Sequence, residues 1–232
     1  MRIHPQIAAR AIEPRYTVPE ASSFIARPTS TVRRWAIGNV RRDASGAERR
    51  DEPLIRVDGD PLSYLPLSFL NLLELRFLSA YRSRVPLQSI RRALEFAAEE
   101  LHVPRPLLTL EFKAKGKSLF LRFATEGEDP YLLNASRRGQ LAWPSALDDF
   151  IESVDYDPRE KSAFRWWPLG RDEPIIVDTL LNGGLPSTAR SGVRTQAIAL
   201  QRSEGFEVRE IAYDVSAAED EVRAALRFER AA

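Results

Sequence analysis

The sequence of 232 residues contains no cysteine and only two histidines, and these shortages exclude several functional classes. Without cysteine the chain cannot build a disulfide framework, a thiolate zinc site or a cysteine nucleophile. The histidines, His4 and His102, have no further ligand-type residues at the spacing of a metal site. The lack of cysteine also fits a reducing compartment, and we expect a cytoplasmic protein. We expect no metal, no cofactor and no catalytic residue.

Long apolar stretches are equally absent. No run approaches the roughly 18 to 20 residues that a membrane-spanning helix needs, and residues 1–15 lack the continuous apolar segment of a signal peptide. Apolar residues nevertheless make up 44% of the chain and charged residues 29%, which is enough for an ordinary buried core. We therefore expect a globular protein without membrane association.

The net charge is only +1, so the distribution of charge is more informative than its sum. Residues 27–56 contain eight arginines and four acids, whereas residues 201–232 contain five arginines and eight acids. A polyanion such as DNA would be attracted to the first segment and repelled by the second.

A short helix is predicted at residues 18–25. Thr17 precedes it as the N-cap, Pro19 lies in the first turn, and Glu20 follows Thr17 by three residues, as in a capping box. These signals make the start of this helix the best-defined boundary in the sequence.

A second helix is predicted to run to Ile37, with Thr29 or Ser30 as its N-cap and Gly38 at its end. Two short helices joined by a tight turn are the pattern of a helix-turn-helix, whose second helix enters the major groove of DNA. Val32 and Trp35 are spaced to face inward. The predicted DNA-contacting residues on this helix are Thr29, Ser30, Thr31, Arg33 and Arg34.

A β-wing is predicted after the helix pair. Residues 39–52 are polar around Ser45 and Gly46, and residues 54–57 are expected to form a strand. The wing arginines expected to contact phosphate are Arg41, Arg42, Arg49 and Arg50. An alternative explanation is that the helices simply belong to a helical domain and that the arginines are solvated.

The rest of the sequence predicts a mainly α fold with small β elements: an N-terminal winged helix-turn-helix-like domain, a β-hairpin and linker region, and a C-terminal trihelical helix-turn-helix-like module. The expected domains are residues 1–124, 125–171 and 172–232. Helices are predicted at residues 67–83, 87–101, 195–201, 208–213 and 217–229, with a short one near 147–154. Extended segments are predicted at residues 107–112, 119–123, 164–167 and 175–177.

Several segments resemble known regulators. Residues 16–21 (YTVPEA) and 30–35 (STVRRW) are similar to the helix-turn-helix of MerR-like regulators and VapB-type antitoxins. Residues 85–93 (VPLQSIRRA) are similar to the MerR-like helix that follows the wing. That family commonly has glycine and an apolar residue in the turn, where this chain has Ala26 and Arg27. The resemblance implies a dimer that binds operator DNA.

The C-terminal part resembles a small trihelical domain common in antitoxins encoded beside PIN-domain toxins. The matching segments are residues 174–178, 182–186, 192–195, 208–214 and 221–226. The chain departs from the usual pattern at Asp178-Thr179 and Ser187-Thr188. Glu219, Asp220 and Glu221 open the last helix and would repel phosphate, which favours a protein-facing or dimerising role for this module.

Together these resemblances imply an antitoxin of a type II VapBC-like pair, which neutralises a PIN-domain ribonuclease, represses its own operon, and forms a homodimer or a hetero-oligomer with the toxin. PIN nucleases hold magnesium with clustered acids, which an inserted arginine could neutralise. The predicted toxin-contacting residues are Arg165, Trp166, Trp167, Arg171 and Arg190. The aromatic run at residues 164–167 has an alternative explanation, which we prefer: a core strand that packs the two halves of the chain together.

Two other functions compete with this one. The first is a stand-alone MerR-like transcriptional regulator that senses a small ligand between its helices. The second is an enzyme, for which the best carboxylate clusters are Asp148-Asp149 and Asp155 with Asp157. The sequence offers no catalytic constellation around either cluster, so we do not expect an enzyme.

Overall fold

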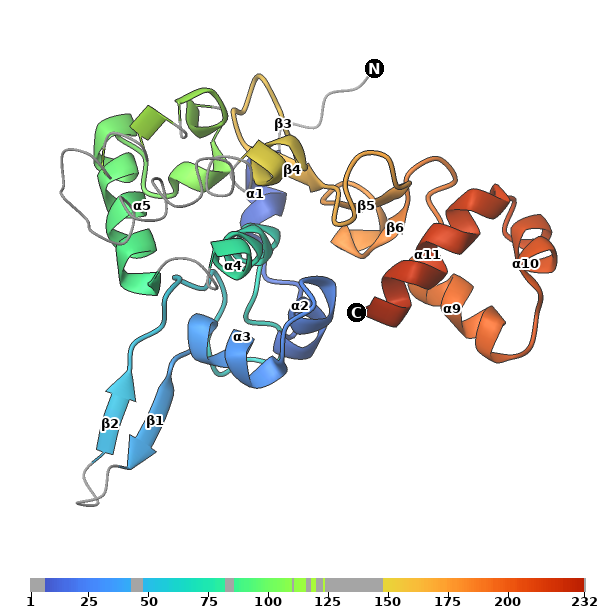
Figure 1. The fold of residues 1–232 in the computed structure, drawn as a ribbon, viewed down its shortest axis with the longest axis horizontal. Helices are drawn as coiled ribbons and strands as arrows, with labels where there is room; N and C mark the ends of the chain where they lie inside the picture. The colour runs from blue at the N-terminus through green and yellow to red at the C-terminus, as the bar shows by residue number, and fades with distance from the viewer. Residues whose placement is uncertain are drawn as a thin grey trace, which may run out of the picture.

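The computed structural model describes residues 7–42, 48–81, 86–109, 111–115, 118–119, 123 and 148–231. Helices dominate, and they accompany a two-stranded wing and a four-stranded antiparallel sheet, as Figure 1 shows. The predicted fold class is confirmed. No helix in these described ranges is long and apolar enough to cross a bilayer.

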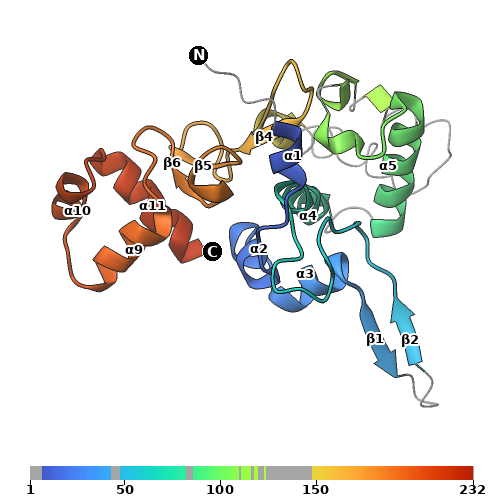
Figure 2. The ribbon, with the colours of Figure 1, turned by 180° about the vertical axis from the view of Figure 1, so that it is seen from behind.

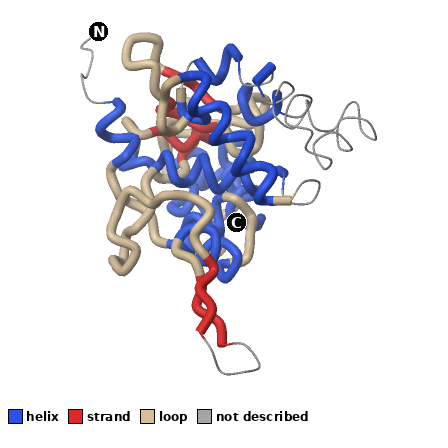
Figure 3. Tube along the Cα trace, turned by 90° about the vertical axis from the view of Figure 1, so that its left-hand side faces the viewer, coloured by secondary structure: helices blue, strands red, loops and turns tan. Residues whose placement is uncertain are grey.

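The N-terminal part is built from short helices and a projecting hairpin. Helices α1 (Ile7–Ile12), α2 (Val18–Phe24) and α3 (Thr29–Ala36) precede strands β1 (Asn39–Arg42) and β2 (Glu48–Asp51). The two strands extend away from the body of the molecule, which Figure 3 shows in side view. The predicted helix pair and wing are therefore present, although Ser45 and Gly46 of the predicted turn lie outside the described residues.

Two longer helices follow at the predicted positions. Helix α4 (Phe69–Tyr81) is covered on nearly all sides, because its leucines and phenylalanines point into the core all round the helix. Helix α5 (Leu87–Leu101) is amphipathic and ends at His102, which takes a left-handed conformation with φ 55°. A short 3₁₀ turn, η1 (Pro106–Leu108), comes next.

Three predicted strands are wrong. Residues 54–57 form no strand, because the amides of Leu54 and Ile55 both donate to the carbonyl of Trp35 instead of a strand partner. The pair expected at residues 107–112 and 119–123 is replaced by η1 and by helical residues at 111–115, 118–119 and 123. The hydroxyl of Thr109 accepts from the amide of Phe112 at 3.2 Å, which is a helix-capping contact that no strand would make.

The sheet has the order β3-β4-β5-β6, with β3 (Val154–Tyr156), β4 (Ala163–Trp166), β5 (Ile175–Asp178) and β6 (Ser187–Thr188). All neighbours pair antiparallel. The extended segments predicted at residues 164–167 and 175–177 correspond to β4 and β5. The predicted helix near Val154 is shorter than expected: residues 148–152 are helical, and Val154 already belongs to β3.

The C-terminal module contains the three predicted helices. These are α9 (Thr195–Ser203), α10 (Val208–Asp214) and α11 (Glu219–Ala231), which follow the glycine-rich 3₁₀ turn η2 (Asn182–Gly184). Their core includes Ile198, Ile211, Val222 and Phe228. Val222 is fully buried and closes the module's own core.

The main core runs through all three of the predicted domains. It includes Trp35 and Phe77 from the N-terminal helices, Phe150 and Trp166 from the region predicted as linker, and Val177 from β5. Residues 148–166 therefore pack as part of the N-terminal body. The boundaries at residues 124 and 171 remain a prediction, but the apolar core extends across the second one.

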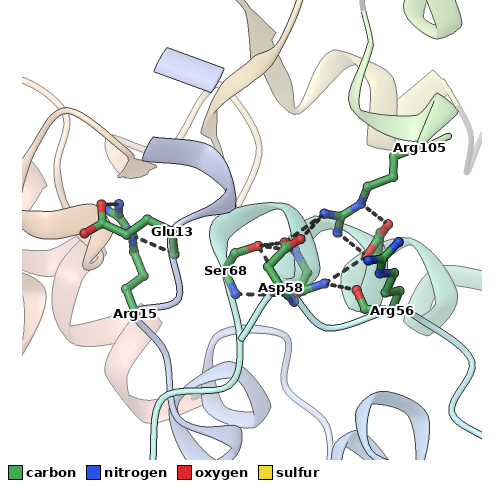
Figure 4. A network of polar contacts seen from close by, with 8 residues as sticks. Glu13, Arg15, Arg56, Asp58, Ser68 and Arg105 are labelled. Carbon is green, nitrogen blue, oxygen red and sulfur yellow. Dashed lines mark hydrogen bonds and ion pairs between the residues drawn. The ribbon is translucent and has the colours of Figure 1, made fainter. Parts of the chain in front are cut away.

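A polar network holds the segment after the wing against α4, and Figure 4 shows it from close by. The Arg105 guanidinium donates to Glu74 at 2.6 and 2.8 Å and to both carboxylate oxygens of Asp58 at 2.8 Å. Asn71 accepts the amide of Asp58 and donates to the carbonyl of Arg56. Burial raises the pKa of Glu74, and the charge and hydrogen bonds of Arg105 oppose that shift.

Tyr16 joins the N-terminal body to the C-terminal part. Its backbone pairs with Leu67 in both directions, and its buried hydroxyl donates to the carbonyl of Gly184 at 2.6 Å. Burial raises the pKa of the Tyr16 phenol well above its usual value, so the hydroxyl stays a donor. Gly184 has φ +83°, and a Cβ at this position would lie 2.6 Å from the tyrosine oxygen.

This contact predicts a specific double-mutant cycle. Tyr16→Phe should lower the free energy of unfolding by about 1–3 kcal/mol, because a buried carbonyl loses its donor. Gly184→Ala should lower the free energy of unfolding by at least as much, because alanine is strained at this positive φ and its Cβ would clash with the tyrosine oxygen. The double variant should be less unstable than the sum, since Phe lacks the clashing oxygen. Denaturant unfolding measures this, and strict additivity would show that the two residues do not contact each other.

Candidate nucleic-acid interface

The first helix of the pair starts as the sequence predicted. The Thr17 hydroxyl accepts the amide of Glu20 at 3.1 Å, and the Glu20 carboxylate accepts the amide of Thr17 at 2.8 Å. This is a complete capping box, with Pro19 in the first turn. Thr17 is buried, so the cap also fixes where the helix enters the core.

The turn between α2 and α3 has the geometry of a left-handed helix cap despite its unusual residues. The amide of Arg27 donates to Ser22 and that of Ala26 to Ser23, which is the Schellman pattern. Ala26 has φ 51°, the conformation that glycine usually supplies at such a cap. The departure from the MerR-like pattern is thus in the side chain and not in the backbone.

The predicted N-cap of the second helix is wrong. Helix α3 begins at Thr29, and Pro28 is the N-cap with no side-chain cap bond. The amides of Thr31 and Val32 instead donate to the carbonyl of Pro28. Thr29 and Ser30 therefore lie in the first turn, where both are exposed and their hydroxyls are available to a ligand.

The two faces of α3 divide as predicted. Val32 and Trp35 are buried at 0% and 1% exposure, whereas Arg33 is exposed and Arg34 half-buried. In the part of the chain that the structure describes, neither arginine forms an ion pair. Their guanidiniums can therefore bind an incoming anion without first losing a carboxylate partner.

The wing is attached directly to the end of α3. β1 and β2 pair with Val40 opposite Arg50 and Arg41 opposite Arg49, so the predicted phosphate-contacting arginines lie on neighbouring strands. After β2 the chain returns to α3, where the Trp35 carbonyl accepts from Leu54 at 2.7 Å. This bond sets the position of the wing relative to the exposed face of α3.

The arginines predicted to contact a toxin are already paired with acids. Arg165 donates to Asp178 at 2.7 Å, and the Asp178 side chain is only 4% exposed. Arg171 contacts Asp155 at 2.5 Å and lies over the ring of Trp167, 5.5 Å from its centroid. Of these arginines, Arg171 is on a more open surface than Arg165.

Arg190 is also engaged, by the acids that open α11. It binds both carboxylate oxygens of Asp220 at 2.6 Å and lies 3.8 Å from Glu221. Glu221 is buried and accepts the amides of Arg190 and Ser191, while Glu219 pairs with Arg223. The acids at the start of α11 therefore hold the module together, a role that the sequence did not predict.

Trp166 does not face a partner. Its side chain is 1% exposed and belongs to the main core, so it cannot contact another protein from this position. Trp167 is half-buried and donates its ring NH to Asp155 at 3.0 Å. The predicted partner surface is therefore corrected to exclude Trp166.

Three exposed apolar side chains on the C-terminal module were not predicted from the sequence. Leu200 is 59% exposed, Phe206 48% and Tyr213 90%, at the end of α9, in the following turn and on α10. The sequence did offer a signal for the two helical residues. Leu200 and Tyr213 are apolar but lie off the buried face of their helices, and a helix that is buried on one side does not require apolar residues on the other. Within the described ranges, no group of three or more metal-ligating side chains gathers anywhere.

Comparison with known proteins agrees with this arrangement. Residues 14–94 match the protein family described as "Putative DNA-binding HTH domain". The chain is 27% identical over 222 residues to "Putative antitoxin VapB45" of Mycobacterium tuberculosis, with 92% of each sequence covered. The fold is similar to the crystal structure of Rv2018 from Mycobacterium tuberculosis, with a TM-score of 0.73, 23% identity, and 92% of this chain and 97% of that chain covered.

The family match covers α2, α3, the wing, α4 and the first half of α5, which is the unit that presents Arg33 beside the wing. The similarity to an antitoxin extends over both the N-terminal body and the C-terminal module. These matches are to a DNA-binding domain and an antitoxin, not to an enzyme. The resemblance to VapB-type antitoxins predicted from the sequence is therefore confirmed, together with a DNA-binding helix-turn-helix domain at residues 14–94.

Proposed function

We propose that this protein is an antitoxin of a type II VapBC-like pair, which binds operator DNA through α3 and the wing. The observation that carries the proposal is the exposed face of α3, where Arg33 forms no ion pair with any described residue and lies beside a wing anchored on Trp35. Arginine is the commonest reader of guanine in the major groove, and wing arginines suit the phosphate backbone. DNA binding by this unit represses the operon in which the protein is encoded.

The two ends of the chain have different proposed roles, DNA binding at the N-terminal end and toxin binding at the C-terminal end. Helix α11 of the C-terminal module begins with three acids, which pair with Arg190, Arg209 and Arg223. These arginines are already neutralised, so we expect the phosphate backbone of DNA to bind only weakly there. The same module exposes Leu200, Phe206 and Tyr213, which suit a protein surface. We assign toxin binding to this module and to the neighbouring Arg171.

Neutralisation of a PIN-domain ribonuclease would use arginines that can leave their present partners. Exposed ion pairs contribute only about 0–1 kcal/mol. The side chains of Arg171 and Arg190 are 46% and 57% exposed, so either can exchange its carboxylate for acids of a toxin. Arg165 is less suited, because its departure would leave the buried Asp178 unpaired.

One observation favours the alternative, a MerR-like regulator that senses a small ligand. A cavity of about 610 Å³ lies between the segment after the wing and helices α4 and α5. Its walls include Ile55, Leu78 and Leu94, and Arg105 also lines it. Leu54 also lines the cavity and is bonded to Trp35, so an occupant could reposition the wing. A regulator of this kind would respond to a small molecule and would not capture a toxin.

The first prediction concerns base recognition by α3. Arg33→Ala with Arg34→Ala should weaken binding to the operator by about 1–3 kcal/mol for each arginine that reads a base, while leaving the circular dichroism spectrum unchanged. Gel shift with operator and unrelated duplexes measures the effect. Arg159→Ala, an exposed arginine on the loop between β3 and β4, is the matched control. A folded double variant that binds the operator as tightly as wild type would contradict the assignment of α3.

The second prediction concerns the wing, whose arginines should affect DNA affinity without affecting sequence preference. A variant without the four wing arginines (Arg41, Arg42, Arg49 and Arg50) should bind all duplexes more weakly and to a similar extent, because arginines that contact phosphate do not read the base sequence. Each phosphate that is no longer neutralised should also reduce the slope of log affinity against log salt by about 0.9. Titrations at several salt concentrations test this. A change of sequence preference with an unchanged slope would place these arginines on bases instead.

Toxin binding is tested by co-purification with the product of an adjacent PIN-like gene. Arg171→Ala and Arg190→Ala should weaken capture by about 2 kcal/mol or more if the arginines enter the acidic site, and Arg159→Ala should not. Point variants are preferred to a deletion after residue 171, which would remove β5 from β4 and Val177 from the main core. Full capture by both variants would contradict this part of the proposal.

A further inference from the structure

A second pocket lies where the helix-turn-helix meets α4 and the C-terminal module. It has a volume of about 330 Å³ and is lined by the turn after α2, by Arg76 and Ser79 of α4, by Pro168 and Leu169, and by Phe228 of α11. Figures 1 and 2 both show the C-terminal end of α11 beside α2, on the other side of α2 from the wing. The proposed DNA-binding surface on α3 and the wing does not include this pocket.

Two guanidiniums share the pocket. Arg27 comes from the turn, where the MerR-like pattern has an apolar residue, and it donates to the hydroxyl of Ser79 at 2.5 Å and to the Ser79 carbonyl at 2.9 Å. Arg76 forms no hydrogen bond or ion pair with any residue that the structure describes. The carboxylate that acts on it is Asp149, which does so through space.

This arrangement is electrostatically unfavourable as it stands. Burial lowers the pKa of the Arg76 guanidinium, the charge of Arg27 lowers it further, and Asp149 opposes both only in part. A half-buried cation beside a second cation gains free energy from an anion placed between them. In contrast, Arg105, which also contacts α4, is already neutralised within the chain by its ion pair with Glu74.

The remaining lining specifies the kind of anion. Ser23 and the buried Ser79 bring hydroxyls to the pocket, and the Ser79 hydroxyl, while accepting from Arg27, still has its own hydrogen to donate. Guanidiniums and hydroxyls together are donors suited to a phosphate group. Phe24, Leu169 and Phe228 form an apolar wall on which the rest of a small molecule can pack.

We propose that this pocket binds a small molecule that carries a phosphate group, held by Arg27, Arg76 and Ser79. The pocket is bounded by α11 as well as by α2, so its occupant contacts both the helix-turn-helix and the C-terminal module. Backbone phosphate of DNA is the other source of the same chemistry. The position beside α11, away from the wing, favours the small molecule.

The test compares inorganic phosphate with chloride at equal ionic strength, using the full chain and following its melting temperature. The wild type should be stabilised by phosphate in a saturable manner. Arg76→Met should melt higher than wild type in chloride, because a half-buried cation is removed from beside its like-charged neighbour. The same variant should bind phosphate about tenfold or more weakly, because a charge-assisted hydrogen bond is removed. If the role of Arg76 were purely structural, Arg76→Met would instead melt lower than wild type in chloride.

Arg159→Met is the matched control, since it removes the same charge from an exposed position outside the pocket. It should keep the full phosphate response. If Arg76→Met does not fold, Arg27→Gln should also lose the response. Equal stabilisation of wild type by phosphate and chloride, or a full phosphate response in a folded Arg76→Met, would overturn the proposal. A loss of duplex binding by Arg76→Met as large as its loss of phosphate binding would assign the pocket to DNA instead.

Discussion

The hydrogen bond between Tyr16 and Gly184 is the contact on which the arrangement of the molecule depends. Tyr16 sits at the entry to the helix-turn-helix, pairs through its backbone with Leu67 before α4, and reaches a carbonyl of the C-terminal part with its hydroxyl. Because the hydroxyl is buried, it has no water to replace that carbonyl, and the contact is costly to break. Three segments that are distant in the sequence are thereby held at fixed positions.

The distribution of ion pairs then separates the two working surfaces. Arginines of the C-terminal module and of the sheet are held by acids from neighbouring elements, such as Arg190 by Asp220 and Arg165 by Asp178. Arg33 and Arg34 on α3 have no such partner among the described residues. An anionic polymer therefore meets unpaired cations on α3, whereas the arginines named here on the sheet and the C-terminal module are neutralised by acids, a difference that a net charge of +1 does not reveal.

The wrong strand predictions share one physical cause. Residues 54–57 and 107–112 contain apolar runs that suit a strand, but their backbone amides bind tertiary or capping partners, the Trp35 carbonyl in one case and the Thr109 hydroxyl in the other. Short apolar runs cannot be assigned from periodicity alone, because a strand is defined by its partner and not by its own residues. Trp166 is part of the core and not a contact residue, which agrees with the alternative prediction of a core strand at residues 164–167.

Features that depend on near neighbours along the chain could be predicted from the residues alone. The capping box of Thr17 and Glu20, the boundaries of α5 and the inward spacing of Val32 and Trp35 all follow from local hydrogen bonds and helical periodicity. Three further features became evident only in the folded molecule: which arginines lack an acidic partner among the described residues, the packing of residues 148–166 in the main core, and the position of Arg27 beside Arg76. Those outcomes depend on contacts between residues dozens of positions apart, where the burial of one side chain is set by another that no local pattern identifies.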